Sequence, residues 1–425
     1  MEQALSLVQG DFDKSKTGVV TFEKIEQEAK ELESVVYRTP TIQSQWLSQF
    51  IDGEVFLKLE NLQITGSFKS RGTYVCMKNL TDAEKSRGVI TMSSGNHAHS
   101  VAYHAQKMGI AATIVMPEST PIAKVERTRS YGASIILHGE TILDARDFTL
   151  QLMRRNNHAL IHPFDDANVI IGQGSVGIEM LTDIPNLDVL LIPIGGGALA
   201  SGVGIVAKKL NPAIQIIGIQ SLYSPSTAEI LFPNTIHIDA RKDSQTIAEG
   251  IAVKAPGHLT LEILRDVLDD MLIVNEPMIE NAMEALIVNN KIIAEGAGAA
   301  GVAAILASRE IFKGKRVGTI ICGGNVDSRI LSNLLMRGLV QEGRLVRLKI
   351  EVTDNPGILG QLSQIIGKIG GNIFEISHQR FFNNIMIKTA YVCAVVETRD
   401  ANHANMICKA LIESGYPTKI VEDSL

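Results

Sequence analysis

Short apolar runs alternate with amphipathic stretches along the chain from about residue 52 to about residue 337. The runs are rich in valine and isoleucine, and they include residues 89–92, 112–116, 189–194, 214–219 and 317–321. Apolar strands separated by helical stretches are typical of parallel sheets covered by helices on both faces. Because this segment is too long for one simple sheet, we predict an α/β fold with two lobes and a cleft between them.

The pattern changes near residue 343, after which we predict strands at residues 345–352, 373–380, 386–398 and 418–421. The helix after the first strand has one apolar face, made of Ile358, Leu362, Ile365, Ile366 and Ile369. A second helix repeats this spacing with Ala404, Ile407, Cys408, Leu411 and Ile412. We expect residues 354–357 to cap the first helix, with Pro356 in its first turn, and Gly415 to end the second. The order βαββαβ predicts a separate ferredoxin-like domain at residues 346–425.

Composition narrows the range of partners. A chain of 425 residues, 45% of them apolar, can bury large cores in two or three domains. Its net charge of −6 and the lack of a long basic run make nucleic acids and anionic membranes poor partners. Four cysteines without CxxC or metal-finger spacing suit a reducing cytoplasm. Residues 1–20 are interpreted as a flexible tail rather than a signal peptide, so we expect a cytoplasmic protein.

One uncharged stretch, residues 189–207, is long enough to resemble a membrane helix. Pro193 and three consecutive glycines, Gly195, Gly196 and Gly197, interrupt it. We therefore predict a buried strand, a glycine loop and a helix, and no membrane contact.

Lys69 is the first candidate for chemistry. It lies in Thr65-Gly66-Ser67-Phe68-Lys69-Ser70-Arg71-Gly72, directly after the strand-like residues 55–59 and a glycine turn. A lysine at the start of such a helix can point into a cleft and form a Schiff base with a carbonyl cofactor. The alternative is a lysine on a solvated helix face.

Three further turns follow predicted strands. Ser93-Ser94-Gly95-Asn96-His97 places N–H and hydroxyl groups where an anion could bind, although an ordinary serine-capped turn is the favoured interpretation of this loop alone. Gly195-Gly196-Gly197 can wrap a phosphate at a helix start. The dinucleotide fingerprint also fits there, but it requires an acid at the end of the next strand, where Gln220 and Ser221 stand. Cys322 precedes another glycine turn and, on its own, is interpreted as an inert buried residue.

The lysine string and these turns, in this order, resemble the threonine/serine dehydratase group of the fold-type-II pyridoxal-phosphate enzymes. The resemblance implies a two-lobed, tryptophan-synthase-β-like catalytic domain at residues 21–340. It implies pyridoxal 5'-phosphate bound to Lys69, beside Phe68, with its phosphate at Gly195, Gly196, Gly197, Ala198 and Leu199. Ala198 replaces the last glycine of the family's tetraglycine loop, which is tolerable if its φ is negative.

By the same resemblance, Asn96 contacts the cofactor's phenolic oxygen and Cys322 faces its pyridine nitrogen. The resemblance also implies that Ser93, Asn96 and His97 hold the substrate carboxylate, and that Ser94 is a further substrate-binding residue. A neutral thiol cannot keep a proton on the pyridine nitrogen, which disfavours transamination and leaves β-elimination as the easier path.

The resemblance implies elimination of water from L-threonine, giving 2-oxobutanoate and ammonia, and of L-serine, giving pyruvate, with Lys69 as general base. A racemase is the alternative within the family, because Ser94 stands where serine racemases carry a second acid/base. A catalytically silent amino-acid sensor is the alternative outside it. Residues 221–226 lack the acids with which racemases hold a divalent ion, so we expect no metal.

The C-terminal residues resemble the ACT family of regulatory domains. That resemblance implies an amino-acid effector near Gly357 and Asn372, or a domain used only for assembly. On either account we expect a homo-oligomer, a dimer or a tetramer. Residues 162–166, 172–174, 249–251 and 295–298 also look family-like but receive no catalytic role; Glu295 could contact the cofactor's rim or form a surface salt bridge.

Overall fold

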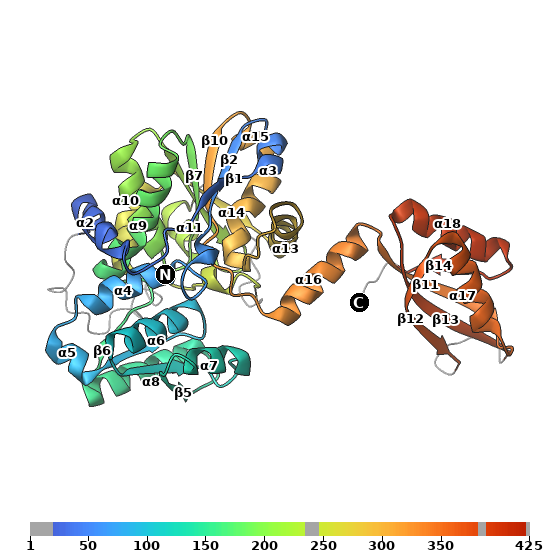
Figure 1. Ribbon diagram of the computed structural model, residues 1–425, viewed down its shortest axis with the longest axis horizontal. Coiled ribbons are helices and arrows are strands. Elements are labelled where there is room, and N and C mark those ends of the chain that lie inside the picture. Colours follow the sequence, from blue (N-terminus) through green and yellow to red (C-terminus); the bar gives the residue numbers. More distant parts are fainter. Residues whose placement is uncertain (1–19, 234–245, 381–387, 422–425) are drawn as a thin grey trace. The chain divides into compact units, whose positions relative to one another are not determined.

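The structure is a computed structural model that describes residues 20–233, 246–380 and 388–421 (Figure 1). The chain divides into two compact units, one ending at Val326 and the other beginning at Asp327. Helix α16 (Ser328–Gln341) belongs to the second unit, whereas the sequence analysis assigned most of it to the first domain. All but the last residue of the predicted tail, residues 1–20, lies outside the described residues.

The larger sheet of the first unit has the strand order β1-β2-β10-β7-β8-β9. All its neighbours are parallel except the antiparallel edge strand β1. The strands are β1 (Thr41–Gln43), β2 (Glu54–Lys58), β7 (Val189–Pro193), β8 (Gln215–Ser221), β9 (Asp270–Val274) and β10 (Arg316–Ile320).

The smaller sheet is wholly parallel, in the order β5-β4-β3-β6. Its strands are β3 (Val89–Met92), β4 (Ala112–Met116), β5 (Ser134–Leu137) and β6 (Ala159–Leu160). Helices α6 (Asn96–Met108), α7 (Ile122–Arg129) and α8 (Ile142–Asn156) pack against it (Figure 1). The two α/β lobes predicted from the apolar runs are therefore confirmed.

The first unit contains further helices and short turns besides those on the smaller sheet. They are α2 (Phe22–Leu32), α3 (Gln45–Phe50), η2 (Glu60–Leu62), α4 (Lys69–Lys78), α5 (Asp82–Arg87), α9 (Ala167–Asp183), α10 (Ala198–Leu210), α11 (Ser226–Leu231), η3 (Glu249–Ile251), α12 (His258–Val267), α13 (Glu276–Ala285), the π-helical turn η4 (Leu286–Asn290), α14 (Gly296–Ala307) and α15 (Arg309–Phe312). The uncharged stretch 189–207 forms β7, the glycine turn and α10, as predicted. Among the residues described, no helix is both long and apolar enough to cross a membrane.

Helix α14 shows why its sequence is built from small residues. It packs on β7, β8, β9 and β10 at very short range. A Cβ atom added to Gly301 would lie only 1.9 Å from Oγ1 of Thr319 on β10. The glycine and alanine side of α14 thus allows a close approach to the sheet, and this fixes the position of Glu295, which directly precedes the helix.

The second unit contains an antiparallel sheet of order β12-β13-β11-β14. Its elements run β11 (Leu345–Thr353), α17 (Ile358–Ile369), β12 (Asn372–Gln379), β13 (Thr389–Glu397), α18 (Ala401–Glu413) and β14 (Thr418–Ile420). The predicted ferredoxin-like order is confirmed. Residues 386 and 387, predicted as strand, lie outside the described residues.

The cap of α17 lies within the predicted residues 354–357, but the predicted place of Pro356 is wrong. The helix begins at Ile358, its N-cap is Gly357 with a φ of +88°, and no side chain caps it. Pro356 therefore precedes the cap and lies outside the first turn. Asp354 instead accepts hydrogen bonds of 2.9 and 3.1 Å from the guanidinium of Arg380.

Candidate active site

Lys69 is the first residue of α4. The preceding turn contains Thr65 and Gly66, with φ values of +62° and +76°. Nζ of Lys69 donates a 2.6 Å hydrogen bond to the backbone oxygen of Pro163. Burial disfavours the ammonium form and lowers the pKa of Lys69 to about 8. A neutral, nucleophilic amine is therefore accessible near neutral pH, which a solvated helix-face lysine would not provide.

The glycine turn between β7 and α10 leaves no room for side chains. A Cβ atom on Gly195 would lie 2.4 Å from the oxygen of Gly250, and one on Gly196 would lie 2.1 Å from the ring of Phe164. Gly197 has a φ of +98° and caps α10. Ala198 is the first helical residue and has no positive φ, so the condition for alanine there is met. With Leu199, the turn places backbone N–H groups at the start of a long helix, an arrangement that binds anions.

Asn96, the first residue of α6, connects the two lobes. Its Nδ2 donates to Oε1 of Glu295 at 2.7 Å, and its Oδ1 accepts from Nδ2 of Asn325 at 2.7 Å. The same Nδ2 of Asn325 is 2.7 Å from the oxygen of Thr65 in the lysine turn. Burial raises the pKa of Glu295 to about 7. The surface salt bridge considered for Glu295 is therefore wrong, since this carboxyl belongs to the site.

Cys322 follows β10 and is buried beneath the lysine turn. Its backbone oxygen accepts from the N–H of Phe68 at 3.1 Å, and Gly323 forms a β-bridge with Ser67. Burial raises the pKa of the Cys322 thiol well above its usual range, so the thiol is neutral. The Phe68 ring centroid lies 5.3 Å from Nζ of Lys69.

The loop after β3 presents Ser93, Ser94 and the first turn of α6. Oγ of Ser93 accepts from the N–H of Gly95 at 3.2 Å. His97 is buried, its Nε2 lies 3.0 Å from the oxygen of Ile161, and burial lowers its pKa to about 3. Because a carbonyl only accepts, Nε2 carries the proton of the neutral ring, and Nδ1 is an acceptor. The donors that this loop can offer to an anion are backbone N–H groups and serine hydroxyls, and the His97 imidazole is not one of them because its Nε2 proton is directed at Ile161.

Gly357 and Asn372 lie at opposite ends of α17. A helix of 12 residues spans about 18 Å. Asn372 donates from Nδ2 to Oε2 of Glu397 at 3.1 Å. Within one chain, the structure does not bring these two candidate effector residues together.

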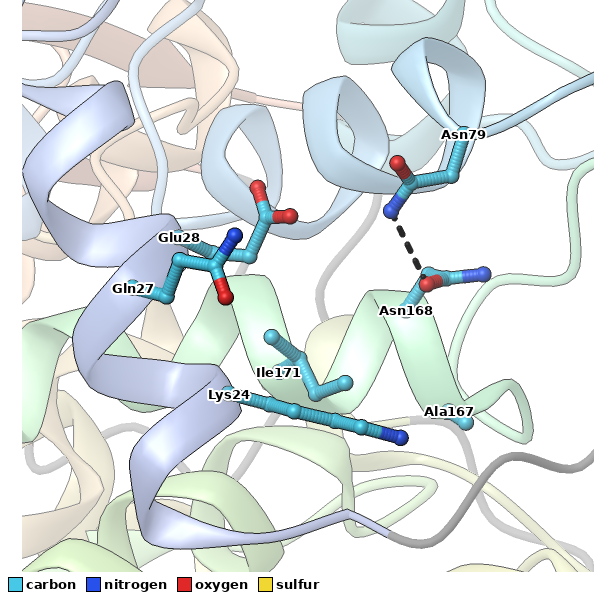
Figure 2. Close-up of a pocket in the computed structure, with 7 residues that line it drawn as sticks. All are labelled: Lys24, Gln27, Glu28, Asn79, Ala167, Asn168 and Ile171. Atoms are coloured by element: carbon cyan, nitrogen blue, oxygen red, sulfur yellow. Dashed lines mark hydrogen bonds between the residues drawn. The ribbon is translucent and has the colours of Figure 1, made fainter.

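A separate hollow of about 280 Å³ lies between α2, the end of α4 and the start of α9. Figure 2 shows its lining and the 3.1 Å hydrogen bond from Nδ2 of Asn79 to Oδ1 of Asn168. None of the predicted site residues lines it. Within the described ranges, no group of three or more His, Cys, Asp or Glu side chains is arranged to hold a metal ion.

A family model described as "Pyridoxal-phosphate dependent enzyme" matches residues 32–323, which contain every residue of the site around Lys69 except Asn325. The chain belongs to this family. Its members depend on pyridoxal phosphate, and the two-lobed fold-type-II architecture described above is the family's catalytic domain.

Individual relatives of this pyridoxal-phosphate enzyme were found by sequence and by structure. An L-threonine ammonia-lyase of Thermotoga maritima is 40% identical over 403 residues, which cover 95% of this chain and 100% of that protein. The solved maize serine racemase superposes with a TM-score of 0.69 at 32% identity, covering 77% of this chain and 100% of that chain. The processed form of threonine deaminase isoform 2 from Solanum lycopersicum superposes with a TM-score of 0.68 at 30% identity, covering 75% of this chain and 90% of that chain.

The residues present fit the cofactor. It needs a lysine amine that can be neutral, and Lys69 has one. It needs a site for a phosphate. The turn at residues 195–197 is too tight for side chains, so its own backbone N–H groups are the donors that a phosphate would meet. It needs polar partners around the ring, and Asn96, Glu295 and Cys322 surround the lysine turn.

Sequence reasoning gave no role to Asn325 and left Glu295 open. Asn325 lies just beyond the carboxyl end of β10, at the same edge of the larger sheet as Cys322, whereas Glu295 precedes α14 and follows no strand. For Asn325 that position was the available signal, because residues beyond the carboxyl ends of parallel strands converge at one edge. The sequence carries no such signal for Glu295.

Proposed function

We propose that this protein is an ammonia-lyase that converts L-threonine to 2-oxobutanoate and ammonia, and L-serine to pyruvate. The match over 95% of the chain to the Thermotoga L-threonine ammonia-lyase carries this proposal. Because the second unit comprises residues 327–425, a match of that extent includes most of it. The shared architecture therefore reaches beyond the domain that binds pyridoxal phosphate.

When bound, pyridoxal phosphate withdraws electrons from the substrate's Cα. Nζ of Lys69 would hold the cofactor's carbonyl carbon, and as a free amine the same nitrogen would accept the Cα proton. A pKa of about 8 suits both tasks, since the amine must lose a proton to attach and must regain one as base. Lys69 is thus the proposed catalytic residue.

The other residues of the site orient the reacting groups. The N–H groups of Gly195, Gly196, Gly197, Ala198 and Leu199 would hold the phosphate at the start of α10, and Phe68 flanks the lysine. Asn96 would contact the phenolic oxygen. The neutral Cys322 thiol would face the pyridine nitrogen and could not keep it protonated, which favours elimination of the β-hydroxyl over transamination.

The substrate carboxylate binds in the loop of Ser93, Ser94, Asn96 and His97. The His97 side chain faces Ile161 as a donor, so His97 contributes its backbone N–H to the carboxylate. This refines the role implied by the family resemblance. The first turn of α6 supplies further free N–H groups there.

Proton NMR of L-threonine with the purified protein in heavy water tests the proposal. Growth of 2-oxobutanoate signals supports the ammonia-lyase. Formation of the allo diastereomer without oxo acid identifies a racemase, and an unchanged spectrum contradicts both and favours the amino-acid sensor.

A serine racemase is the second candidate, because the maize enzyme shares the fold and Ser94 lies in the substrate loop. The match covers the whole racemase chain but only 77% of this chain. The chain therefore contains residues that the racemase does not match, whereas the Thermotoga ammonia-lyase matches almost all of it.

We propose that the second unit is an ACT domain that assembles the oligomer and binds an amino-acid effector. Its edge strand β12 exposes Phe374 (65%) and Ile376 (37%), as expected for a strand that pairs with a second copy. A hollow of about 290 Å³ includes Pro356 and Ile358, on either side of Gly357. Since Asn372 lies at the far end of α17, a site using Gly357 and Asn372 takes one residue from each of two chains. Light scattering, with and without single amino acids, measures both assembly and its dependence on effector.

A further inference from the structure

Residues 162–166, His-Pro-Phe-Asp-Asp, run from β6 of the smaller sheet to α9 and contact two parts of the site. The backbone oxygen of Pro163 accepts the 2.6 Å hydrogen bond from Nζ of Lys69. The ring of Phe164, the next residue, lies against Gly196 of the phosphate turn, where an added Cβ would be 2.1 Å away. Two adjacent residues thus contact the lysine amine and the phosphate cradle.

His162 holds this turn together. Its Nδ1 accepts from the N–H of Asp165 at 2.7 Å and lies 3.3 Å from the N–H of Phe164. Its ring meets the Phe164 ring edge-on, with centroids 4.8 Å apart. Burial and the positive charge of Lys69 lower the pKa of His162 to about 3, so the ring is neutral and Nδ1 remains an acceptor.

The two ends of the segment are fixed by other elements. Before the turn, the oxygen of Ile161 accepts from Oγ1 of Thr91 at 2.8 Å. After it, the Asp165 carboxylate accepts from three N–H groups at the start of α12, at 3.0 to 3.2 Å. Asp166 caps α9 by accepting from the N–H of Val169 at 3.0 Å. The turn between these anchors is the part that His162 fixes.

A backbone carbonyl is a suitable partner for a lysine that must be neutral. A carboxylate in the same place would favour the ammonium form and raise the lysine pKa. The uncharged Pro163 oxygen accepts one N–H and leaves the amine's lone pair free. The position of this carbonyl therefore determines where the free amine rests.

We propose that His162 is a positioning residue for Lys69. By closing the turn through Nδ1, it aims the Pro163 carbonyl at Nζ and keeps Phe164 on the phosphate turn. The amine thereby stays in one place, both for attachment of the cofactor and for acceptance of the Cα proton. This inference rests on the role proposed above for Lys69.

The test measures the Lys69 amine in the cofactor-free protein. Brief acetic anhydride pulses at a series of pH values, followed by peptide mass spectrometry, give the midpoint for acetylation of Lys69. His162→Asn retains an acceptor near the Nδ1 position, His162→Leu removes it, and His162→Gln displaces it at similar size. His138→Leu, which removes an exposed ring stacked on Phe148, is the control.

We expect the wild-type protein, His162→Asn and His138→Leu to share a midpoint near 8. In His162→Leu and His162→Gln the loosened turn admits water to the amine, so the midpoint rises by about one pH unit toward the ordinary lysine value. Attachment of added pyridoxal phosphate, followed by absorbance, slows about tenfold in the same two variants.

Midpoints that stay near 8 in both variants overturn the inference and leave the proposed function intact. If His162→Leu does not fold, as judged by circular dichroism, the Asn and Gln pair decides. A separate experiment tests the proposed function on which this inference rests. If Lys69→Ala still becomes covalently labelled by pyridoxal phosphate and borohydride at one site, the role of Lys69 itself is wrong.

Discussion

Asn96 donates a 2.7 Å hydrogen bond from its Nδ2 to Oε1 of Glu295. Asn96 begins a helix that covers the smaller sheet, and Glu295 precedes the helix that packs on the larger sheet. This contact joins the two lobes at the site. It also keeps a carboxyl group with a raised pKa beside the proposed cofactor position.

The raised pKa of Glu295 should make the stability of the folded protein depend on pH. Burial raises its pKa to about 7, against an ordinary value of 4.5. Between these values the folded state binds more protons than the unfolded state, so this group's contribution to stability is complete below pH 4.5 and is lost as the pH rises through 7. Glu295→Gln keeps the acceptor for Asn96 and removes the titration. In thermal unfolding of the cofactor-free protein, we expect the wild type to lose more Tm than Glu295→Gln between pH 5 and pH 8.

Glu26→Gln, which removes a carboxylate from an exposed i,i+4 pair with Lys30, serves as the control and should follow the wild type. Identical pH dependence in the wild type and Glu295→Gln would show that the carboxyl is already ionised at pH 5. In that case its pKa is not raised.

The sequence predicted the parts of the site that depend on local rules. The strand runs 89–92 and 112–116 coincide with β3 and β4, and Lys69 begins its helix because a glycine turn precedes it. The sequence failed where the outcome depends on distant partners. Asp354 could cap a helix by its spacing, but Arg380 captures its carboxylate. Only the fold shows that Glu295 meets Asn96, since 199 positions separate them in the chain.

Substitution of Gly196 should weaken binding of the cofactor's phosphate. In Gly196→Ala the new Cβ would lie 2.1 Å from the Phe164 ring, so the turn or the ring must move. We expect the Kd for pyridoxal phosphate to rise about 10- to 100-fold, which corresponds to about 1.4–2.8 kcal/mol. Absorbance titration of the cofactor-free protein measures this change.

Gly360→Ala is the matched control, because a Cβ there meets nothing within 4 Å. Adding Phe164→Ala to Gly196→Ala removes the ring that the new Cβ would strike and should recover part of the affinity. The penalty should also be smaller for pyridoxal, which lacks the phosphate. An equal loss for both ligands would place the damage outside the phosphate cradle.

Ser94 separates the two candidate activities. If the protein is an ammonia-lyase, Ser94→Ala should retain elimination within about threefold, because Lys69 alone moves the Cα proton. If Ser94 is a second acid/base, its removal should abolish inversion at Cα. Rates of 2-oxobutanoate and allo-threonine formation by proton NMR measure both. A loss of elimination of 100-fold or more in Ser94→Ala would contradict the ammonia-lyase mechanism.

Arg71 lies two residues after Lys69, and its removal should lower the stability of the folded protein strongly. Its buried guanidinium donates to both oxygens of the buried Glu60 at 2.7 and 2.8 Å and to Glu179 at 2.6 Å. Arg71→Met leaves Glu60 buried without its cation, so we expect a loss of about 3–5 kcal/mol in the free energy of unfolding, measured in urea.

Arg71→Met combined with Glu60→Gln removes the uncompensated charge and should recover part of that loss, because a buried pair costs desolvation as well as giving attraction. Lys78→Met, at the other end of α4, removes a cation whose partners Glu28 and Glu31 are more exposed than Glu60, so its loss should be at most about 1 kcal/mol. A double variant less stable than Arg71→Met alone would contradict this, and would mean that the Glu60 carboxylate gains more from its hydrogen bond with Thr39, whose Oγ1 donates to it at 2.5 Å, than its burial costs.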